Sequence, residues 1–167
     1  DCRGQGRVSV KRSLTVKLPA GIRHGQAVRV QGEGEPPPPE ASPEGKGIPG
    51  DLHVVVGVKQ HGTFERDGDH LLVAVPVSFA QLALGTTLAI DTLDGASSVT
   101  IPAGTQHGAM FRVKGKGLPN LRSGHRGDLV VIVQLVVPGK LDDEQKKLLK
   151  EFAKTEKIEV KDQEAAP

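Results

Sequence analysis

The sequence has no tryptophan, no tyrosine and only four phenylalanines among its 167 residues. Proteins that bind single-stranded nucleic acid stack bases on aromatic rings, so this scarcity argues against that function. Twenty-two basic and 20 acidic residues leave a formal net charge of +2, which is too small to indicate a polyanion or an anionic membrane as the main partner. We therefore expect neither nucleic acid nor a membrane among the partners of this protein.

Cysteine is almost absent as well. Cys2 is the only one, so no disulfide can form within the chain, and a reducing compartment is the simpler expectation. No apolar run approaches the roughly 20 residues of a membrane-spanning helix, and no charged-then-apolar leader stands at the N-terminus. With 37% hydrophobic residues, the chain still has enough apolar surface to fold around one or two cores.

An internal repeat is the most informative feature present. The segment VKLPAGIRHGQAVRVQGEGEP (16–36) returns as VTIPAGTQHGAMFRVKGKGLP (99–119), an offset of 83 positions. A shared Gly-Asp-Leu follows at 50–52 and at 127–129, where the offset is 77, so the first copy holds six more residues in a Pro-rich loop. Glycines persist better than charges, and glycine suits turns with positive φ. We interpret the repeat as two copies of one β-rich backbone architecture.

Apolar periodicity predicts strands. Apolar residues occupy the even positions from 8 to 18, with Arg12 as the exception, which indicates a strand with one buried face. The stretch 127–137 is apolar on both faces, as a covered central strand is. Asp-Gly pairs favour tight hairpin turns. We therefore expect further strands and turns at these places: strands over 50–58 and 70–77, hairpin turns at 66–69 and 93–96.

The pattern changes period near the C-terminus. Asp142 and Gln145 resemble a helix-capping pair, and Leu148, Leu149 and Phe152 fall on one stripe of a helix predicted from about residue 142 to 155. This stripe needs a partner, which is either the second module or another copy of the chain.

No residue cluster indicates catalysis. His24 and His107 occupy matching places in the repeat; a catalytic or metal-binding pair is one interpretation, and a pair of turn residues is the one we favour, because no cysteine or carboxylate recurs beside them. The stretch 61–70 holds two histidines and three carboxylates, which fit either a metal site or, as we favour, a polar hairpin tip. We predict a protein that is not an enzyme, with no catalytic residue and no metal site.

Several segments resemble the C-terminal half of the DnaJ family, the J-domain co-chaperones of the forty-kilodalton heat-shock class. They are CRGQGR at the start, both repeat segments, HGTFERDGDHL and GDLVVIVQLVVP, in unbroken order over about residues 2–153. Cys2 to Gly6 is similar to the tail of the last C-x-x-C-x-G-x-G zinc repeat of the zinc-bearing type. The resemblance implies a fragment of a longer protein, with zinc a cofactor of the full-length family and no cofactor in this part.

The resemblance also implies a mainly β fold: two tandem β-sandwich or barrel-like domains of the DnaJ C-terminal type, with a short C-terminal helix. The expected segments are a remnant of the last zinc-binding repeat (1–7), an incomplete, client-binding C-terminal domain I (8–59), C-terminal domain II (60–138), and a helical dimerisation segment with a disordered tail (139–167).

The implied function is that of a cytoplasmic co-chaperone of the stress response. Unfolded client polypeptides bind domain I as an added strand, with an apolar side chain in a pocket, and pass to the seventy-kilodalton heat-shock chaperone of the DnaK type. The resemblance places the pocket at Leu14 and Val54, and the strand pattern adds Val16, Leu18 and Val56. Homodimerisation is expected through Leu148, Leu149 and Phe152.

Two alternatives stay open. In the first alternative, Leu14 and Val54 are ordinary core residues, and the chain is a β-rich dimerisation scaffold with no client binding of its own. A hydrolase or polysaccharide-binding module is the second, and it needs a cleft lined by carboxylates or aromatic rings, which this composition hardly supplies. Ser97 stands in the second copy where the first has Leu14. We therefore expect the first module to bind the client and the second mainly to space and present the first.

Overall fold

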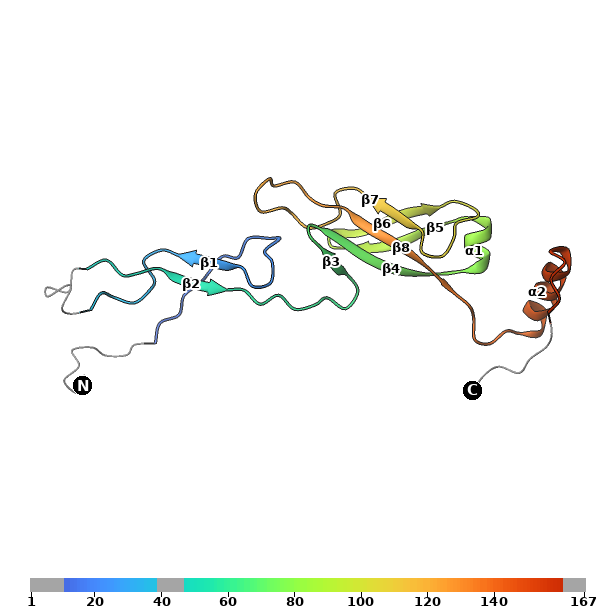
Figure 1. The fold of residues 1–167 in the computed structure, drawn as a ribbon, viewed down its shortest axis with the longest axis horizontal. Helices are drawn as coiled ribbons and strands as arrows, with labels where there is room; N and C mark the ends of the chain where they lie inside the picture. The colour runs from blue at the N-terminus through green and yellow to red at the C-terminus, as the bar shows by residue number, and fades with distance from the viewer. Residues whose placement is uncertain (1–10, 39–46, 161–167) are drawn as a thin grey trace. The chain divides into compact units, whose positions relative to one another are not determined.

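The computed structural model describes residues 11–38 and 47–160. The fold is mainly β, as predicted (Figure 1). Its elements follow in the order β1 (Ala27–Val30), β2 (Leu52–Val55), β3 (Glu65–Asp67), β4 (His70–Ser78), α1 (Phe79–Leu84), β5 (Thr86–Thr92), β6 (Gly95–Ile101), β7 (Met110–Val113), β8 (Leu129–Val136) and α2 (Asp143–Thr155).

The strands form three sheets. β1 pairs with β2, β5 pairs with β6, and the largest sheet has the order β3-β4-β8-β7. β8 therefore lies between two strands, which confirms the prediction of a covered central strand. Proline has no backbone N–H to give to a neighbouring strand. Pro76 is tolerated in β4 because β3 pairs only with residues 70–72, so no β3 residue lies beside Pro76 to accept such a hydrogen bond.

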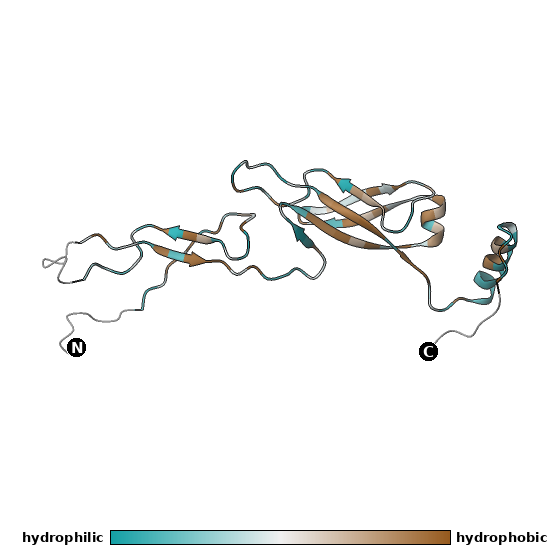
Figure 2. Cartoon of the chain, viewed as in Figure 1, coloured by the Kyte–Doolittle hydropathy of each residue, from teal (hydrophilic) through white to brown (hydrophobic). Residues whose placement is uncertain are grey.

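The chain divides into two compact units, residues 1–72 with 113–129 and residues 73–112 with 130–167. The buried apolar side chains of the second unit come from β4, α1, β5, β6 and β8. Figure 2 shows apolar residues running along β4 and β8. The members of this core are Val73, Val77, Leu82, Ile90, Val99, Ile101, Val131 and Val133. The domain boundaries expected at 59/60 and 138/139 stay a prediction.

Both predicted hairpin turns are confirmed. β3 and β4 are joined by Gly68 and Asp69, with Gly68 at φ +61°, and β5 and β6 are joined by Leu93 and Asp94. The Asp-Gly pairs thus sit at or beside the tightest connections in the chain, where glycine adopts positive φ without a steric penalty.

The C-terminal helix α2 is also confirmed with its predicted start. Asp142 is the N-cap: its Oδ1 accepts from the Gln145 backbone N–H at 2.7 Å, and the Gln145 side chain accepts from the Asp142 N–H at 3.1 Å. The short helix α1 was not predicted from the sequence. Its signal was the same kind of capping box, formed here by Ser78 and Gln81.

The strand expected over residues 8–18 is wrong for the part that the structure describes: residues 11–18 form no strand, and residues 8–10 lie outside the described ranges. The matching segment of the second copy is β6, which pairs with β5 along its whole length. A strand is stable only when its N–H and C=O groups are paired. Among the described residues, 11–18 have no strand neighbour, so the alternating pattern alone does not make them a strand.

Candidate functional site

Each copy of the repeat is closed by the same close approach of glycines. Gly34 donates its backbone N–H to Gly50 O at 2.8 Å, and Gly117 donates to Gly127 O at 2.8 Å. A Cβ at Gly34 would lie 2.7 Å from the Gly50 carbonyl carbon, and one at Gly117 would lie 2.6 Å from that of Gly127. Side chains do not fit there, which explains why both copies keep these glycines.

The shared Gly-Asp-Leu has a structural cause too. Asp51 Oδ1 accepts from the Gly32 N–H at 2.9 Å, and Asp128 Oδ1 accepts from the Gly115 N–H at 2.9 Å. Arg29 also donates to Asp51. The Gly32 N–H, and next the Arg29 guanidinium, hold the pKa of Asp51 below its ordinary value of 3.8, against partial desolvation. Both carboxylates therefore fasten a turn rather than face a substrate.

The two matching histidines serve the same turns. His24 Nδ1 accepts from the Val58 N–H at 3.2 Å, and His107 Nδ1 accepts from the Leu135 N–H at 3.0 Å. In each ring Nδ1 is occupied by this backbone hydrogen bond and does not face a ligand. This arrangement supports turn residues over a catalytic or metal-binding pair.

The polar stretch 61–70 contains the β3–β4 turn, and Asp69 and His70 beside this turn have protein partners. Asp69 accepts from the Asn120 side chain and from Arg23, the latter at 3.2 Å. The Asn120 hydrogen bond, and next that of Arg23, hold the pKa of Asp69 below its ordinary value of 3.8. His70 Nδ1 accepts from the Asp128 N–H at 2.9 Å. Within the described ranges, no group of three or more His, Cys, Asp and Glu side chains is placed to hold a metal ion.

Zinc, which the family resemblance implies for the whole protein, does not fit this chain. A structural zinc site takes about four protein ligands, usually with several thiolates. Cys2 is the only cysteine of the sequence, and it lies outside the described residues. We therefore assign zinc no role here.

The predicted apolar site residues lie in the first unit with unequal exposure. Leu14 is 38% exposed and Leu18 is 51% exposed, whereas Val16 and Val54 are half-buried and Val56 is buried. Val54 belongs to β2, and Val56 follows directly after it. Leu14, Val16 and Leu18 share no strand face, contrary to the prediction, because no strand forms there.

The ribbon of β1 and β2 has one partly covered apolar face. Val54 stands opposite Val28, and Leu52 stands opposite Val30; all four are half-buried. Val55 points to the other face and is 68% exposed. Within the described part of the chain, β1 and β2 each have one strand neighbour, so each leaves one edge of backbone N–H and C=O groups without a strand beside it.

The second copy covers the same positions completely. The counterparts of Leu52, Val54 and Val56 have no exposed surface, and those of Val16 and Leu18 are 7% and 1% exposed: Leu129, Val131, Val133, Val99 and Ile101. Leu14 alone has a polar counterpart, Ser97. The counterparts of four of the five predicted site residues are thus core residues of the second copy, whereas in the first copy only Val56 is buried.

The predicted dimerisation residues lie along α2, which buries none of its side chains. Leu148 is 59% exposed, and Leu149 and Phe152 are each 43% exposed. Phe152 meets Phe79 of α1 edge-on, with ring centroids 5.7 Å apart. This aromatic contact joins α2 to α1 within the second unit. Within the described residues, Leu148 and Leu149 stay partly exposed on this stripe. None of the described helices is long and apolar enough to cross a bilayer.

Comparison with known proteins agrees with these features. The profile of the family described as "DnaJ C terminal domain" matches residues 4–138. "Chaperone protein DnaJ" of Bacillus mycoides (strain KBAB4) is 49% identical over 152 residues, which is 91% of this chain and 40% of the relative. "Chaperone protein DnaJ" of Rhodopirellula baltica is 48% identical over 91% of this chain and 37% of its own length. The chain spans about two-fifths of these relatives, and it belongs to the DnaJ C-terminal domain family.

Proposed function

We propose that this chain forms the client-binding and dimerising part of a DnaJ-type co-chaperone. An extended apolar segment of an unfolded polypeptide adds as a strand beside the first β domain and places an apolar side chain against Leu14 and the valines of β2. The client then passes to a seventy-kilodalton heat-shock chaperone of the DnaK type in the cytoplasm. Family membership supports the co-chaperone role, and the free edges of the β1–β2 ribbon support strand addition.

One observation carries the proposal. The apolar positions that form the covered core of the second copy are half-buried or exposed in the first, with Val56 as the exception. Large apolar surface that folding leaves partly uncovered marks a place where another polypeptide binds. Leu14 adds an exposed apolar side chain where the second copy has serine.

The expected affinity is modest. Two client side chains contribute about 1.5–3 kcal/mol each when they are buried. Ordering the client and the loss of its free motion offset much of this gain, so dissociation constants near the micromolar range follow. Weak binding suits a protein that catches a client and then releases it to a partner.

The sharpest test is Leu14→Ser, because it gives the first copy the residue that the second copy has at the same place. Binding of a fluorescein-labelled apolar heptapeptide, followed by anisotropy, should weaken about tenfold. The melting temperature should not change, since Leu14 is partly exposed. Val55→Ser, on the far face of β2, is the matched control and should leave binding unchanged.

The competing interpretation predicts a different pattern. If these residues only form a core, Leu14→Ser will bind the peptide as the wild type does, and Val54→Asp will unfold the first unit instead of weakening binding by a folded protein. Circular dichroism on each variant separates loss of binding from loss of fold.

A dimerisation scaffold without client binding is the second candidate, and the exposed stripe of α2 favours it. Such a scaffold would sediment as a dimer yet fail to slow the aggregation of a chemically unfolded protein. The proposed co-chaperone part does both.

A further inference from the structure

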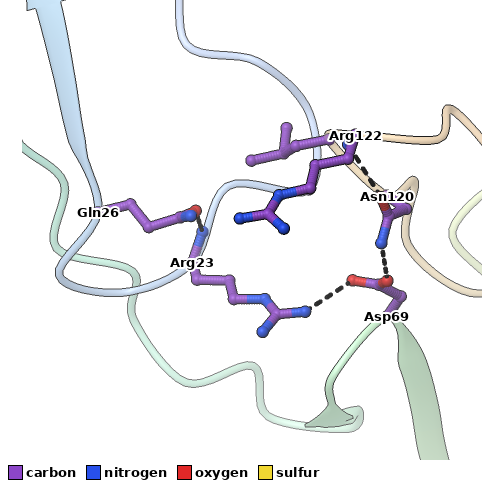
Figure 3. A pocket seen from close by; sticks show the side chains of 7 residues that line it. Arg23, Gln26, Asp69, Asn120 and Arg122 are labelled. Atoms are coloured by element: carbon purple, nitrogen blue, oxygen red, sulfur yellow. Dashed lines mark hydrogen bonds and ion pairs between the residues drawn. The ribbon is translucent and has the colours of Figure 1, made fainter.

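The first unit contains a polar hollow distinct from the apolar site. Its volume is about 310 Å³, and its walls come from the turn before β1, the β3–β4 turn and the loop that precedes β8. These segments are far apart in the sequence but belong to one compact unit. Figure 3 shows the side chains of Arg23 and Arg122 entering this space from different loops, beside Gln26 and Asp69.

Most of the charged and amide side chains that line the hollow are hydrogen-bond donors. The one carboxylate in its wall, Asp69, already accepts from Asn120 and from Arg23. Gln26 uses its side-chain oxygen to accept from the Arg23 N–H at 2.6 Å, which leaves its NH₂ group as a donor. The guanidinium of Arg122 has no hydrogen-bond or ion-pair partner among the described residues.

We propose that this hollow binds a carboxylate group of a polypeptide. Two guanidinium groups and an amide are donors with the planar geometry that carboxylates accept in pairs. The volume is at the lower end of the roughly 300–1,000 Å³ of ligand pockets, which fits one or two acidic groups and not a nucleotide. Leu121, which is 45% exposed, lines the same wall and gives the neighbouring apolar part of a peptide a surface to contact.

A polypeptide as the source of the carboxylate rests on the proposed function, in which the chain binds unfolded clients. The site itself goes beyond that function, because it reads a charge and shares no residue with the apolar site. A client with an acidic group a few residues from an apolar one would then be held at two places, which raises its affinity through effective concentration.

The test uses labelled peptides and the complete chain. One hexapeptide carries two adjacent glutamates and an amidated C-terminus; a second has glutamines instead and a free C-terminal carboxylate; a third has glutamines and an amidated end. Anisotropy at low ionic strength should show binding of the first, the second or both, and none of the third. Which of the first two binds identifies a side chain or a chain end as the source.

Three variants locate the binding. Arg122→Gln should weaken it about tenfold or more, since a hydrogen bond between charged groups is lost. Arg12→Gln removes the same charge outside the hollow, where Arg12 pairs with Glu33, and should leave binding nearly unchanged. Asp69→Asn keeps the side-chain shape and removes the competing negative charge, so it should strengthen binding several-fold. If Asp69→Asn only loosened the loops around the hollow, peptide binding would weaken instead.

Equal binding of all three hexapeptides, or of none, overturns the proposal. So does an equal loss in Arg12→Gln and Arg122→Gln, because net charge would then be the cause. A heptapeptide with apolar residues and no carboxylate, measured in parallel, keeps the two proposals apart. If it binds while the acidic peptides do not, only the carboxylate site is rejected.

Discussion

Replacing Gly117 by alanine should destabilise the fold, and the structure gives the size of the effect. The new Cβ would lie 2.6 Å from the carbonyl oxygen of Asp69 and 2.6 Å from the carbonyl carbon of Gly127, whereas ordinary contacts are 3.4–4 Å. Both atoms are backbone, so the β3–β4 turn or the start of β8 must move. Such overpacking costs about 1–3 kcal/mol.

The movement also stretches hydrogen bonds. Gly117 N–H to Gly127 O and Leu118 N–H to Asp69 O are both 2.8 Å, and each contributes about 1 kcal/mol. The free energy of unfolding should therefore fall by about 2–4 kcal/mol, a large part of the usual 5–15 kcal/mol of a domain. Gly34→Ala should show a comparable loss in the first copy, since its Cβ would lie 2.7 Å from Gly50.

Urea denaturation followed by circular dichroism measures these losses. Gly62→Ala is the matched control, because a Cβ there has no atom within 4 Å. Its stability should be unchanged or slightly higher, because alanine restricts the unfolded chain. A loss below about 0.5 kcal/mol in Gly117→Ala, no larger than for an ordinary surface substitution, would refute the idea that backbone contact preserves these glycines.

Further expectations concern acid stability and self-association. The pKa of Asp51 is lowered in the fold, so its contribution to stability is complete above the unfolded value near 3.8 and is lost as the pH falls through the folded pKa. Asp51→Asn should therefore flatten the loss of stability below about pH 4 in acid titrations followed by circular dichroism. An unchanged slope would contradict this. Leu149→Ala and Phe152→Ala should each raise the dimer dissociation constant about tenfold or more in analytical ultracentrifugation. Lys147→Ala, on the opposite side of α2, is the control and should leave the constant unchanged. Equal effects of all three would refute dimerisation through the stripe.

Much of the fold could be predicted from local pattern. The stretch 127–137 has the double-sided apolar character of a strand between two others, and β8 is such a strand. Asp142 and Gln145 fixed the start of α2 because a capping box depends on residues three apart. The repeat is visible in the sequence because its glycines recur, and they do so for two reasons. Gly34 and Gly117 closely approach backbone, whereas the pairs Gly25/Gly108 and Gly32/Gly115 adopt positive φ.

The errors have a physical origin in missing partners. Residues 11–18 carry the alternation of a strand, as β6 does, but β6 has β5 beside it and residues 11–18 have no strand neighbour among the described residues. Alternation reports which face a strand would bury and not whether a second strand pairs with it. The helix α1 is only six residues long, too short for its apolar spacing to stand out.

The candidate sites were predictable to different degrees. Val54 and Val56 lie in and beside a strand, as expected, while the proposed role of Leu14 came from the family resemblance, and its difference from Ser97 distinguished the two copies. The polar hollow was not predictable, since Arg23, Asp69 and Arg122 come from three loops. Only the fold brings these residues together, and no spacing in the sequence records it.

Backbone amide exchange with and without a bound apolar heptapeptide tests the central claim most directly. Strand addition predicts that slower exchange appears along one free edge of the β1–β2 ribbon, at alternate residues, because only alternate N–H groups of an edge strand point toward an added strand. Amides of β5 and β6, which pair with each other along their whole length, should exchange as before. Protection confined to α2, or no protection at a saturating peptide concentration, would contradict client binding by this part of the chain.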